Sequence, residues 1–270
     1  RTGLSRFTFP KGESHILLNL GEGLTNETGA TVRIVNDTEI EGSKLLGTFC
    51  YNPQAVFPVY FVMKVNKAPK KMGYWKKQRE MKGVEAEWDI YSGKYKLYTS
   101  YTREMSGDDV GVWFDYDTDE GEAIEVKMGI SYVSIENARL NMNTEQPGFD
   151  FDKVRTASTM WNKDLSKVQV EGGTKDEKTI FYTGMYHLLI HPNILQDVNG
   201  EYPMMESLKV GHTTGNRYTV FSLWDTYRNV STLMTLLYPE RQLDIIRTML
   251  DMYRENGWLP KWELYGRETF

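Results

Sequence analysis

Apolar and polar residues alternate along the first half of the chain, which is the pattern of strands that bury one face. Two runs show it most clearly, Phe57 to Val65 and Ile124 to Tyr132, because every second residue in them is apolar. Turn-forming sequences such as Asn36-Asp37 and Asp119-Glu120-Gly121 lie between such runs. The pattern predicts that residues 1–133 form an antiparallel β-sandwich.

After Ser134 the apolar residues are spaced as they are in helices. We expect a short helix from Ile135 to Asn143, inside a linker that spans residues 134–149. Periodic apolar positions then predict four longer helices, at residues 151–170, 175–190, 222–237 and 240–256. Residues 150–270 are therefore predicted to form a helical domain, and the chain is expected to be an α+β multidomain protein.

The last two of these helices are predicted to form a hairpin, because Pro239 separates them. The final helix carries an apolar stripe at helical spacing, formed by Leu243, Ile246, Leu250 and Tyr253. We expect this stripe to be buried.

The composition excludes several classes of protein. A net charge of -5 provides no electrostatic footprint for nucleic acid, and we interpret the one basic run, Lys64 to Lys82, as a solvated hairpin. The single cysteine, Cys50, excludes an internal disulfide. No stretch approaches 18 apolar residues and the N-terminus does not read as a signal peptide, so we expect neither a transmembrane segment nor an export signal in this chain.

The segment Phe221 to Arg228 combines an acid, an indole and a guanidinium at the expected start of a helix. In the structural interpretation, the negative charge of Asp225 is stabilised by the helix dipole at the start of the helix. We give this interpretation about half of the prior probability. In the functional interpretation Asp225 accepts hydrogen bonds from sugar hydroxyls while Trp224 offers a ring face. Arg228 follows Trp224 by four residues and so points the same way.

Glu263 lies in a second segment of interest, Gly257 to Gly266, where Gly257 and Pro260 force an irregular connection after a helix. Its neighbours Trp262 and Leu264 would partly desolvate the carboxyl group, which raises its pKa toward the range of a general acid. Most loop glutamates are solvated, so residue type alone gives Glu263 a chance of about one in ten of being catalytic.

The histidines give weaker signals. His187 and His191 are four residues apart and could share a metal, but the HExxH pattern is absent and a structural role is favoured. The glycine-rich loop around His212 lacks the spacing and the lysine of a phosphate-binding loop.

Three segments together resemble the core motifs of glycoside hydrolase family 92, and their order and spacing match. They are Asp197 to Tyr202, Phe221 to Arg228 and Gly257 to Leu264. The opening segments Arg6 to Pro10 and Ile16 to Gly21 resemble a strand pair of the family's N-terminal domain, so the resemblance covers nearly the whole chain.

The resemblance implies a β-sandwich followed by the first helical hairpins of an (α/α)6 barrel, and an exo-α-mannosidase that works by inversion with the help of Ca2+. It implies that Glu263 is the general acid, and that Trp224, Asp225 and Arg228 belong to the mannose-binding segment. We also expect Trp262 to contact substrate. Some members carry glutamine at the acid position and act on mannosyl phosphates, whereas Glu263 favours an ordinary alcohol leaving group.

The resemblance also implies that this chain holds only part of the enzyme. The catalytic base and most of the calcium ligands are expected after Phe270, and no metal ligand is assigned here. We expect the chain to be an internal fragment whose partner is the rest of its own barrel. The family alone implies a periplasmic or secreted location. It also implies that the substrates are glycans with terminal α-linked mannose, of α-1,2 linkage. The run Pro203 to Leu208 departs from the family pattern and leaves the linkage open.

Two other functions compete with this interpretation. One is an inverting glucosidase or phosphorylase on a similar sandwich and helical barrel, which would be indifferent to chelators. The other is a non-catalytic glycan-binding protein, which the aromatic content of 13% would permit.

Overall fold

A computed structural model describes residues 1–23, 27–47, 55–77, 95–98 and 103–269. The chain divides into two compact units, and each is described by itself. The first comprises residues 1–49 and 56–149, and the second comprises residues 50–55 and 150–270. Cys50 and the end of the basic run, from residue 78 onward, lie outside the described residues.

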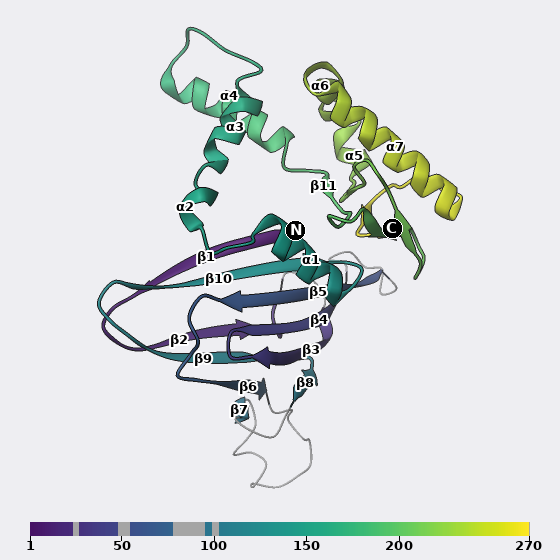
Figure 1. Ribbon diagram of the computed structural model, residues 1–270. Helices are drawn as coiled ribbons and strands as arrows, with labels where there is room; N and C mark the ends of the chain where they lie inside the picture. Colours follow the sequence, from purple (N-terminus) through teal and green to yellow (C-terminus); the bar gives the residue numbers. More distant parts are fainter. Residues whose placement is uncertain (24–26, 48–54, 78–94, 99–102, 270) are drawn as a thin grey trace, which may run out of the picture. The chain divides into compact units, whose positions relative to one another are not determined.

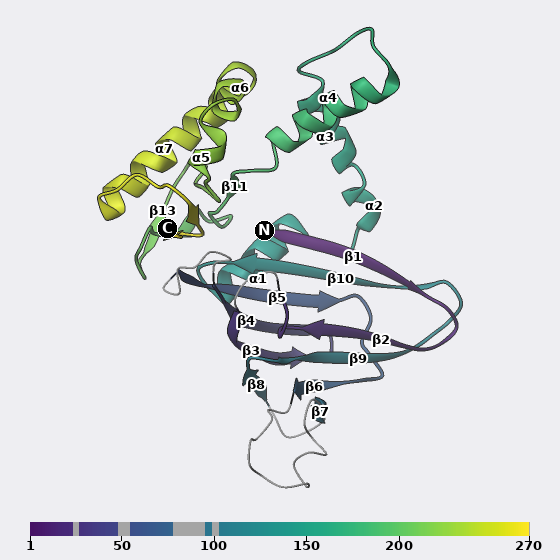
Figure 2. The same ribbon diagram turned by 180° about the vertical axis from the view of Figure 1, so that it is seen from behind.

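Two antiparallel sheets form the first unit (Figure 1). The larger sheet has the order β1 (Thr2–Phe9), β10 (Glu122–Ser131), β5 (Val56–Val65), β4 (Glu39–Gly47), β3 (Glu27–Asn36) and β8 (Glu104–Gly107). The smaller has the order β2 (Gly12–Asn19), β9 (Val110–Thr118), β6 (Lys71–Lys77) and β7 (Tyr95–Tyr98). The same stacking of the two sheets is visible from behind (Figure 2).

The core of this unit lies between the two sheets. The larger sheet contributes Val32, Phe61 and Ile124, and the smaller sheet contributes Val112 and Phe114. Alternate residues of each strand face this core, as the period-2 pattern requires. The predicted β-sandwich is confirmed, and β5 and β10 match the two predicted runs.

Two predicted strand pairings are wrong. The described part of the basic run, residues 64–77, does not form a hairpin, because β5 pairs with β4 and β10 whereas β6 pairs with β9 and β7 in the other sheet. The opening strands β1 and β2 likewise belong to different sheets. Alternation identifies a strand and its buried face but not its partner, and both connections cross from one sheet to the other.

Helix α1 (Ile135–Glu145) lies on the larger sheet, so residues 134–149 belong to the first unit. Its N-cap Ser134 accepts a hydrogen bond from Asn137 N–H at 3.1 Å. Ala138 and Met142 pack on Val62, on the sheet face opposite the sandwich core. A Cβ atom on Gly129 would lie 2.3 Å from the Ala138 carbonyl oxygen, so glycine is what permits this close approach.

The second unit contains six helices within the described residues, joined by short strands (Figures 1 and 2). They are α2 (Phe151–Val154), α3 (Ala157–Leu165), α4 (Lys175–Leu188), α5 (Leu223–Thr226), α6 (Val230–Leu237) and α7 (Pro239–Asn256). Two predicted helices are therefore each divided in two, at residues 155–156 and 227–229. None of the described helices is both long and apolar enough to cross a membrane.

The predicted buried stripe on α7 is wrong. Leu243, Ile246, Leu250 and Tyr253 are exposed, and the helix instead buries the face that carries Ile245 and Met252. That face packs with Met205, Tyr218 and Met234 in the core of the second unit. Helix α7 thus has two apolar faces, and periodicity did not indicate which of them this unit covers.

Three two-stranded ladders position the residues discussed below. They are β11 (Asn193–Ile194) with β14 (Tyr218–Thr219), β12 (Glu201–Pro203) with β13 (Val210–His212), and β15 (Glu263–Leu264) with β16 (Arg267–Glu268).

Candidate active site

Glu263 is the first residue of β15, in a tight hairpin that follows α7. Gly257 ends α7 in the left-handed conformation, with φ of 87°. The Glu268 carboxylate accepts hydrogen bonds from the backbone N–H groups of Lys261 at 2.8 Å and Trp262 at 2.7 Å. These two hydrogen bonds fix the backbone of Lys261 and Trp262, which directly precede Glu263 in the chain.

The Glu263 side chain has no exposed surface, and neutral donors surround its carboxyl group. Gly266 N–H donates to Oε1 at 2.6 Å, and Val220 N–H donates to Oε2 at 3.1 Å. The Thr219 hydroxyl lies 2.9 Å from Oε1 and 3.1 Å from Oε2. A substrate oxygen can reach this carboxyl group only if Glu263 or the groups that cover it move.

Burial raises the pKa of Glu263 to about 7. The hydrogen bonds from Gly266 and Thr219, the charge of Arg217 and the hydrogen bond from Val220 act in the opposite direction, because each stabilises the carboxylate. Burial outweighs them, since the described groups that touch the carboxyl group directly are dipoles without a net charge. Glu263 can therefore be protonated near neutral pH, as a general acid must be.

The structure places the predicted segment Phe221 to Arg228 directly beside Glu263. Phe221 N–H donates to the Glu263 carbonyl at 2.9 Å, and Leu223 N–H donates to the Lys261 carbonyl at 3.2 Å. Helix α5 starts at this point, so Trp224 and Asp225 immediately follow the residues that contact the hairpin. The two segments that sequence analysis singled out are thus neighbours in space.

The predicted substrate-binding side chains do not themselves bond to the Glu263 carboxyl group in the part of the chain described. Trp224 is 79% exposed. Asp225 accepts a hydrogen bond from the N-cap residue Ser222, whose side chain makes no capping bond to the helix. Arg228 Nε donates to the Tyr227 hydroxyl at 2.6 Å. Trp224, Asp225 and Arg228 are thus solvent-accessible groups next to the hairpin.

Trp262 is partly buried, and hydrogen bonds of its backbone fix its position. Its carbonyl oxygen accepts hydrogen bonds from Thr269 N–H at 3.0 Å and from the Thr269 hydroxyl at 2.7 Å. Its expected contact with substrate stays a prediction.

A buried ion pair supports the site, and sequence analysis missed it. Arg217, directly before β14, donates to Glu255 of α7 through Nη1 at 3.0 Å and Nη2 at 2.8 Å. Tyr202 OH and Met205 N–H also donate to Glu255, at 3.0 and 2.7 Å. The guanidinium stacks on the Tyr202 ring, 4.4 Å from its centroid. The pair joins α7 to the strand that carries Thr219, and no local spacing signals it.

The described residues contain no cluster of the side chains that most often hold metal ions. Nowhere among them do three or more His, Cys, Asp or Glu side chains gather closely enough to hold a metal ion. His187 lies in the last turn of α4, and His191 lies beyond the end of that helix, so they do not share a helix face. We derive no chemical step through calcium, and its expected role stays a prediction.

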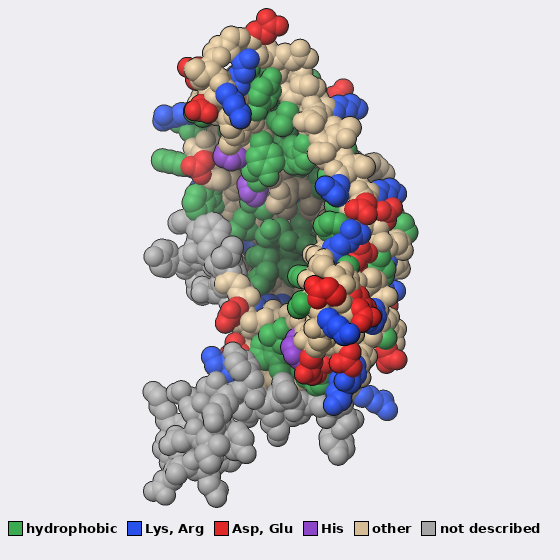
Figure 3. Space-filling model, turned by 90° about the vertical axis from the view of Figure 1, so that its left-hand side faces the viewer, with side chains coloured by type: hydrophobic (Ala, Val, Ile, Leu, Met, Phe, Trp, Pro, Cys, Tyr) green, Lys and Arg blue, Asp and Glu red, His purple; other side chains and the backbone are tan. Residues whose placement is uncertain are grey.

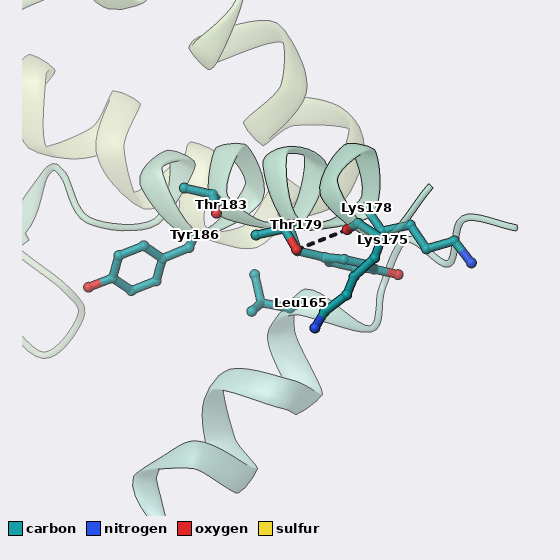
Figure 4. Close-up of a pocket in the computed structure, with 7 residues that line it drawn as sticks. Leu165, Lys175, Lys178, Thr179, Thr183 and Tyr186 are labelled. Atoms are coloured by element: carbon teal, nitrogen blue, oxygen red, sulfur yellow. Dashed lines mark hydrogen bonds between the residues drawn. The ribbon is translucent and has the colours of Figure 1, made fainter. Parts of the chain in front are cut away.

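A groove of about 760 Å3 lies along α4, away from Glu263 in the sequence (Figure 4). It is lined by Leu165, Lys175, Lys178, Thr179, Tyr182, Thr183 and Tyr186. The Thr179 hydroxyl donates a hydrogen bond to the Lys175 carbonyl oxygen at 3.0 Å. None of the predicted site residues lines this groove.

The described residues thus form a two-unit protein, a β-sandwich followed by a helical unit that holds a buried glutamic acid in a hairpin after its last helix. The sequence model of the glycosyl hydrolase family 92 N-terminal domain matches residues 1–131, and that of the family 92 catalytic domain matches residues 137–270. The chain belongs to glycoside hydrolase family 92.

Solved structures of the family are similar over the whole chain. A family GH92 α-mannosidase from Bacteroides thetaiotaomicron, also solved with mannoimidazole, is 31% identical with a TM-score of 0.84 and is matched over 100% of this chain and 35% of its own. An inverting family GH92 mannosidase from the same organism shares the fold, with a TM-score of 0.80, 23% identity, and coverage of 99% of this chain and 34% of its own.

A curated relative adds a more distant comparison. It is described as an uncharacterized secreted glycosidase of Arthroderma benhamiae and is 27% identical over 143 residues, which are 51% of this chain and 14% of that protein. The chain thus spans about a third of the solved structures that it matches, and a smaller share of the fungal relative.

Proposed function

We propose that this chain supplies the acid half of the active site of an exo-α-mannosidase, with Glu263 as the general acid. The observation that carries the proposal is the buried Glu263 carboxyl group, whose pKa is raised to about 7. A general acid works best when its pKa lies near the working pH, because it must be protonated before the step and able to give up the proton during it.

The chemistry that we propose is inversion. Glu263 protonates the glycosidic oxygen of a terminal α-mannoside while a base activates water on the opposite face of the sugar, with the two carboxyl groups roughly 6.5–9.5 Å apart. We propose that the base and most of the calcium ligands are supplied by residues outside this sequence. Because Glu263 is buried, the proposal also requires that sugar binding moves Glu263 or the groups covering it.

The substrate that we propose is a glycan with a terminal α-1,2-linked mannose. Family membership and the similar mannosidases support the sugar, and the exposed Trp224 ring supports a sugar-stacking platform beside the hairpin. The secreted fungal relative supports a periplasmic or secreted location.

We further propose that the rest of the same chain completes the helical barrel. Several large apolar side chains of the second unit are exposed, among them Met160, Ile180, Leu236 and Leu250. Hydrophobic side chains are visible on the molecular surface in Figure 3. Apolar faces of this extent normally pack against other elements, and the solved relatives are about three times as long as this chain.

The test is Glu263→Gln in the full-length enzyme, with two substrates. On α-1,2-mannobiose, whose leaving group needs a proton, we expect the rate to fall by about 10² to 10⁴. On 2,4-dinitrophenyl α-mannoside the leaving group is dinitrophenolate, which departs without protonation. The rate on this substrate should therefore fall much less. Wild-type kcat/KM on mannobiose should decline as the pH rises through about 7, because ionised Glu263 cannot donate a proton.

Two controls make the result interpretable. The matched variant Glu240→Gln changes an exposed glutamate of α7 and should leave both rates unchanged. Retained activity of Glu263→Gln on the activated substrate shows that the site is folded. Unchanged hydrolysis of mannobiose by Glu263→Gln contradicts the acid assignment.

Two further measurements separate the competing functions. Inversion predicts β-mannose as the first product in an NMR time course, and calcium assistance predicts loss of activity with a chelator. An enzyme that is indifferent to chelation and hydrolyses α-glucosides supports the glucosidase alternative. Binding of mannosides without any hydrolysis supports the non-catalytic one.

A further inference from the structure

The sequence of the catalytic domain begins on the sandwich. The family model of that domain starts at residue 137, inside α1, whereas α1 belongs to the first compact unit together with the strands. Residues 146–150, between α1 and α2, are therefore the connection through which the chain leaves the first unit. The groups that hold this connection decide where the chain leaves.

The connection has little of its own to hold it. It contains no helix or strand, and Pro147-Gly148 is a turn-forming pair. Both residues are exposed, and a Cβ atom on Gly148 would meet nothing within 4 Å beyond its chain neighbours. Helix α1 also has no basic residue in its last turn to balance the partial negative charge of its terminal carbonyl groups. A turn of this kind is mobile unless a group outside it fixes it.

Lys127 of β10 provides such a group. Its Nζ atom donates hydrogen bonds to the carbonyl oxygens of Gln146 at 2.9 Å and Pro147 at 3.1 Å. The same atom lies 4.9 Å from the centroid of the Phe149 ring, a distance at which a cation and an aromatic ring attract each other. One ammonium group thus contacts three residues of the connection.

The ammonium group of Lys127 is buried, with 4% of the residue exposed. Burial lowers its pKa, the charge of Lys64 on β5 acts in the same direction, and Glu39 on β4 opposes both. Glu39 is itself bonded to Lys64 and to Arg139 of α1. Within the described residues the hydrogen bonds of Lys127 go to carbonyl oxygens, which a buried cation needs because uncompensated burial of a charge is costly. The ammonium group and the connection therefore hold each other in place.

A second contact holds the same end of α1 from β1. Glu145, the last residue of α1, accepts hydrogen bonds from Arg1 Nε at 2.8 Å and from the Thr2 hydroxyl at 3.1 Å. Strands β1 and β10 are paired, with Leu4 opposite Lys127, and α1 lies over their sheet (Figure 1). Both strands thus attach the C-terminal end of α1, and Lys127 continues this attachment into the connection.

We propose that Lys127 is a clamp that fixes the connection between the sandwich and the catalytic domain, so that the chain leaves the sandwich at one point, after Phe149. Apolar packing of α1 on the sheet extends to Met142. Lys127 extends the rigid part of the first unit from there to Phe149. The inference is independent of the role proposed for Glu263.

The experiment is hydrogen exchange of the full-length enzyme, measured by mass spectrometry on peptides that cover residues 143–150. Lys127→Met keeps most of the aliphatic stem and removes the charged donor of two hydrogen bonds. We expect exchange in these peptides to become about ten- to a hundredfold faster, because the clamp no longer opposes local opening. Chymotrypsin cleavage after Phe149 should accelerate by a similar factor, since cleavage follows the population of the open form. Wild-type exchange in peptides from β5 and β9 shows that the sandwich is folded.

Lys64→Met is the matched control. Lys64 lies opposite Lys127 in the sheet, but its ammonium group pairs with Glu39 at 2.8 Å. This variant should leave exchange and cleavage of the connection unchanged. Wild-type exchange of residues 143–150 in Lys127→Met overturns the proposal. Equal acceleration in Lys127→Met and Lys64→Met also overturns it, because the effect would then come from removing any charge from this sheet.

Phe149→Leu decides the question if Lys127→Met does not fold. It removes the ring beside the ammonium group and keeps both hydrogen bonds, so exchange of residues 143–150 should become about two- to fivefold faster. Wild-type exchange in a folded Phe149→Leu variant would then overturn the proposal.

Discussion

Two buried glutamates of the second unit have their charge compensated in different ways. Glu255 faces the guanidinium of Arg217 in a bidentate ion pair, with two further donors from Tyr202 and Met205. Glu263 is contacted only by a hydroxyl and backbone amides among the described residues. Burial is the largest cause of the shift at Glu263, and it raises the pKa of that carboxyl group to about 7.

The Arg217–Glu255 pair is expected to be structural, and Glu255→Gln tests this. The variant leaves the Arg217 charge buried, where only 2% of its side chain is exposed, without a counter-charge. Removing one partner of a buried pair costs about 3–5 kcal/mol of unfolding free energy. Asp251→Asn is the matched control on the same helix, because Asp251 pairs with Arg254 at the surface and should cost about 1 kcal/mol or less.

Urea unfolding of the full-length protein, followed by circular dichroism, measures both variants. Equal destabilisation by Glu255→Gln and Asp251→Asn would contradict a special role for the buried pair.

Residue-level sequence patterns could reach Glu263 but not its surroundings. Its flanking apolar residues and its position after a helix end are local features. Thr219 lies 44 residues earlier, and its contact with Glu263 arises only when β14 is brought beside the hairpin. The same holds for Arg217 and Glu255, which are 38 residues apart. Tertiary contacts of single polar residues leave no periodic signal in a sequence.

At the scale of elements, periodicity predicted the type of each long segment but not all of its breaks. The break between α2 and α3 lacks glycine and proline. There the Thr156 hydroxyl donates to the Lys153 carbonyl at 2.6 Å, and the Ser158 hydroxyl donates to the Arg155 carbonyl at 3.1 Å. Hydroxyl groups that bond to nearby carbonyls compete with regular helix bonds. Such competition leaves only a weak signal in the sequence, so the pattern predicted a continuous helix.

Docking of α1 on the larger sheet should depend on Gly129. An added methyl group would lie 2.3 Å from the Ala138 carbonyl oxygen and 2.7 Å from Met142 Cβ. We expect Gly129→Ala to lower the unfolding free energy by about 1–3 kcal/mol, since the helix must shift away from β10. Gly3→Ala is the control on the neighbouring strand β1, because its Cβ would meet no atom within 4 Å.

Thermal unfolding of the full-length variants measures the effect of both alanines. A Gly129→Ala variant as stable as Gly3→Ala would show that α1 can move off the sheet without cost.

At the scale of the whole molecule, the open question is what covers the second apolar face of α7. The face that packs within the second unit carries Ile245 and Met252. The other face carries Leu243, Ile246, Leu250 and Tyr253, all exposed in this structure. Sequence periodicity marked this second face as buried, which is wrong for the described residues. A helix with two apolar faces is typical of a position between two layers of helices.

The layered arrangement predicts that Leu250 matters for stability only in the full-length protein. In this structure Leu250 is 45% exposed, so truncation alone would remove few contacts. If further helices of the chain cover it, Leu250→Ala leaves a cavity and should cost about 2–5 kcal/mol. Leu208→Ala is the control, because Leu208 is 95% exposed and lies in a loop. Denaturant unfolding of the full-length variants decides: a Leu250→Ala cost no larger than that of Leu208→Ala would mean that this face of α7 stays in water.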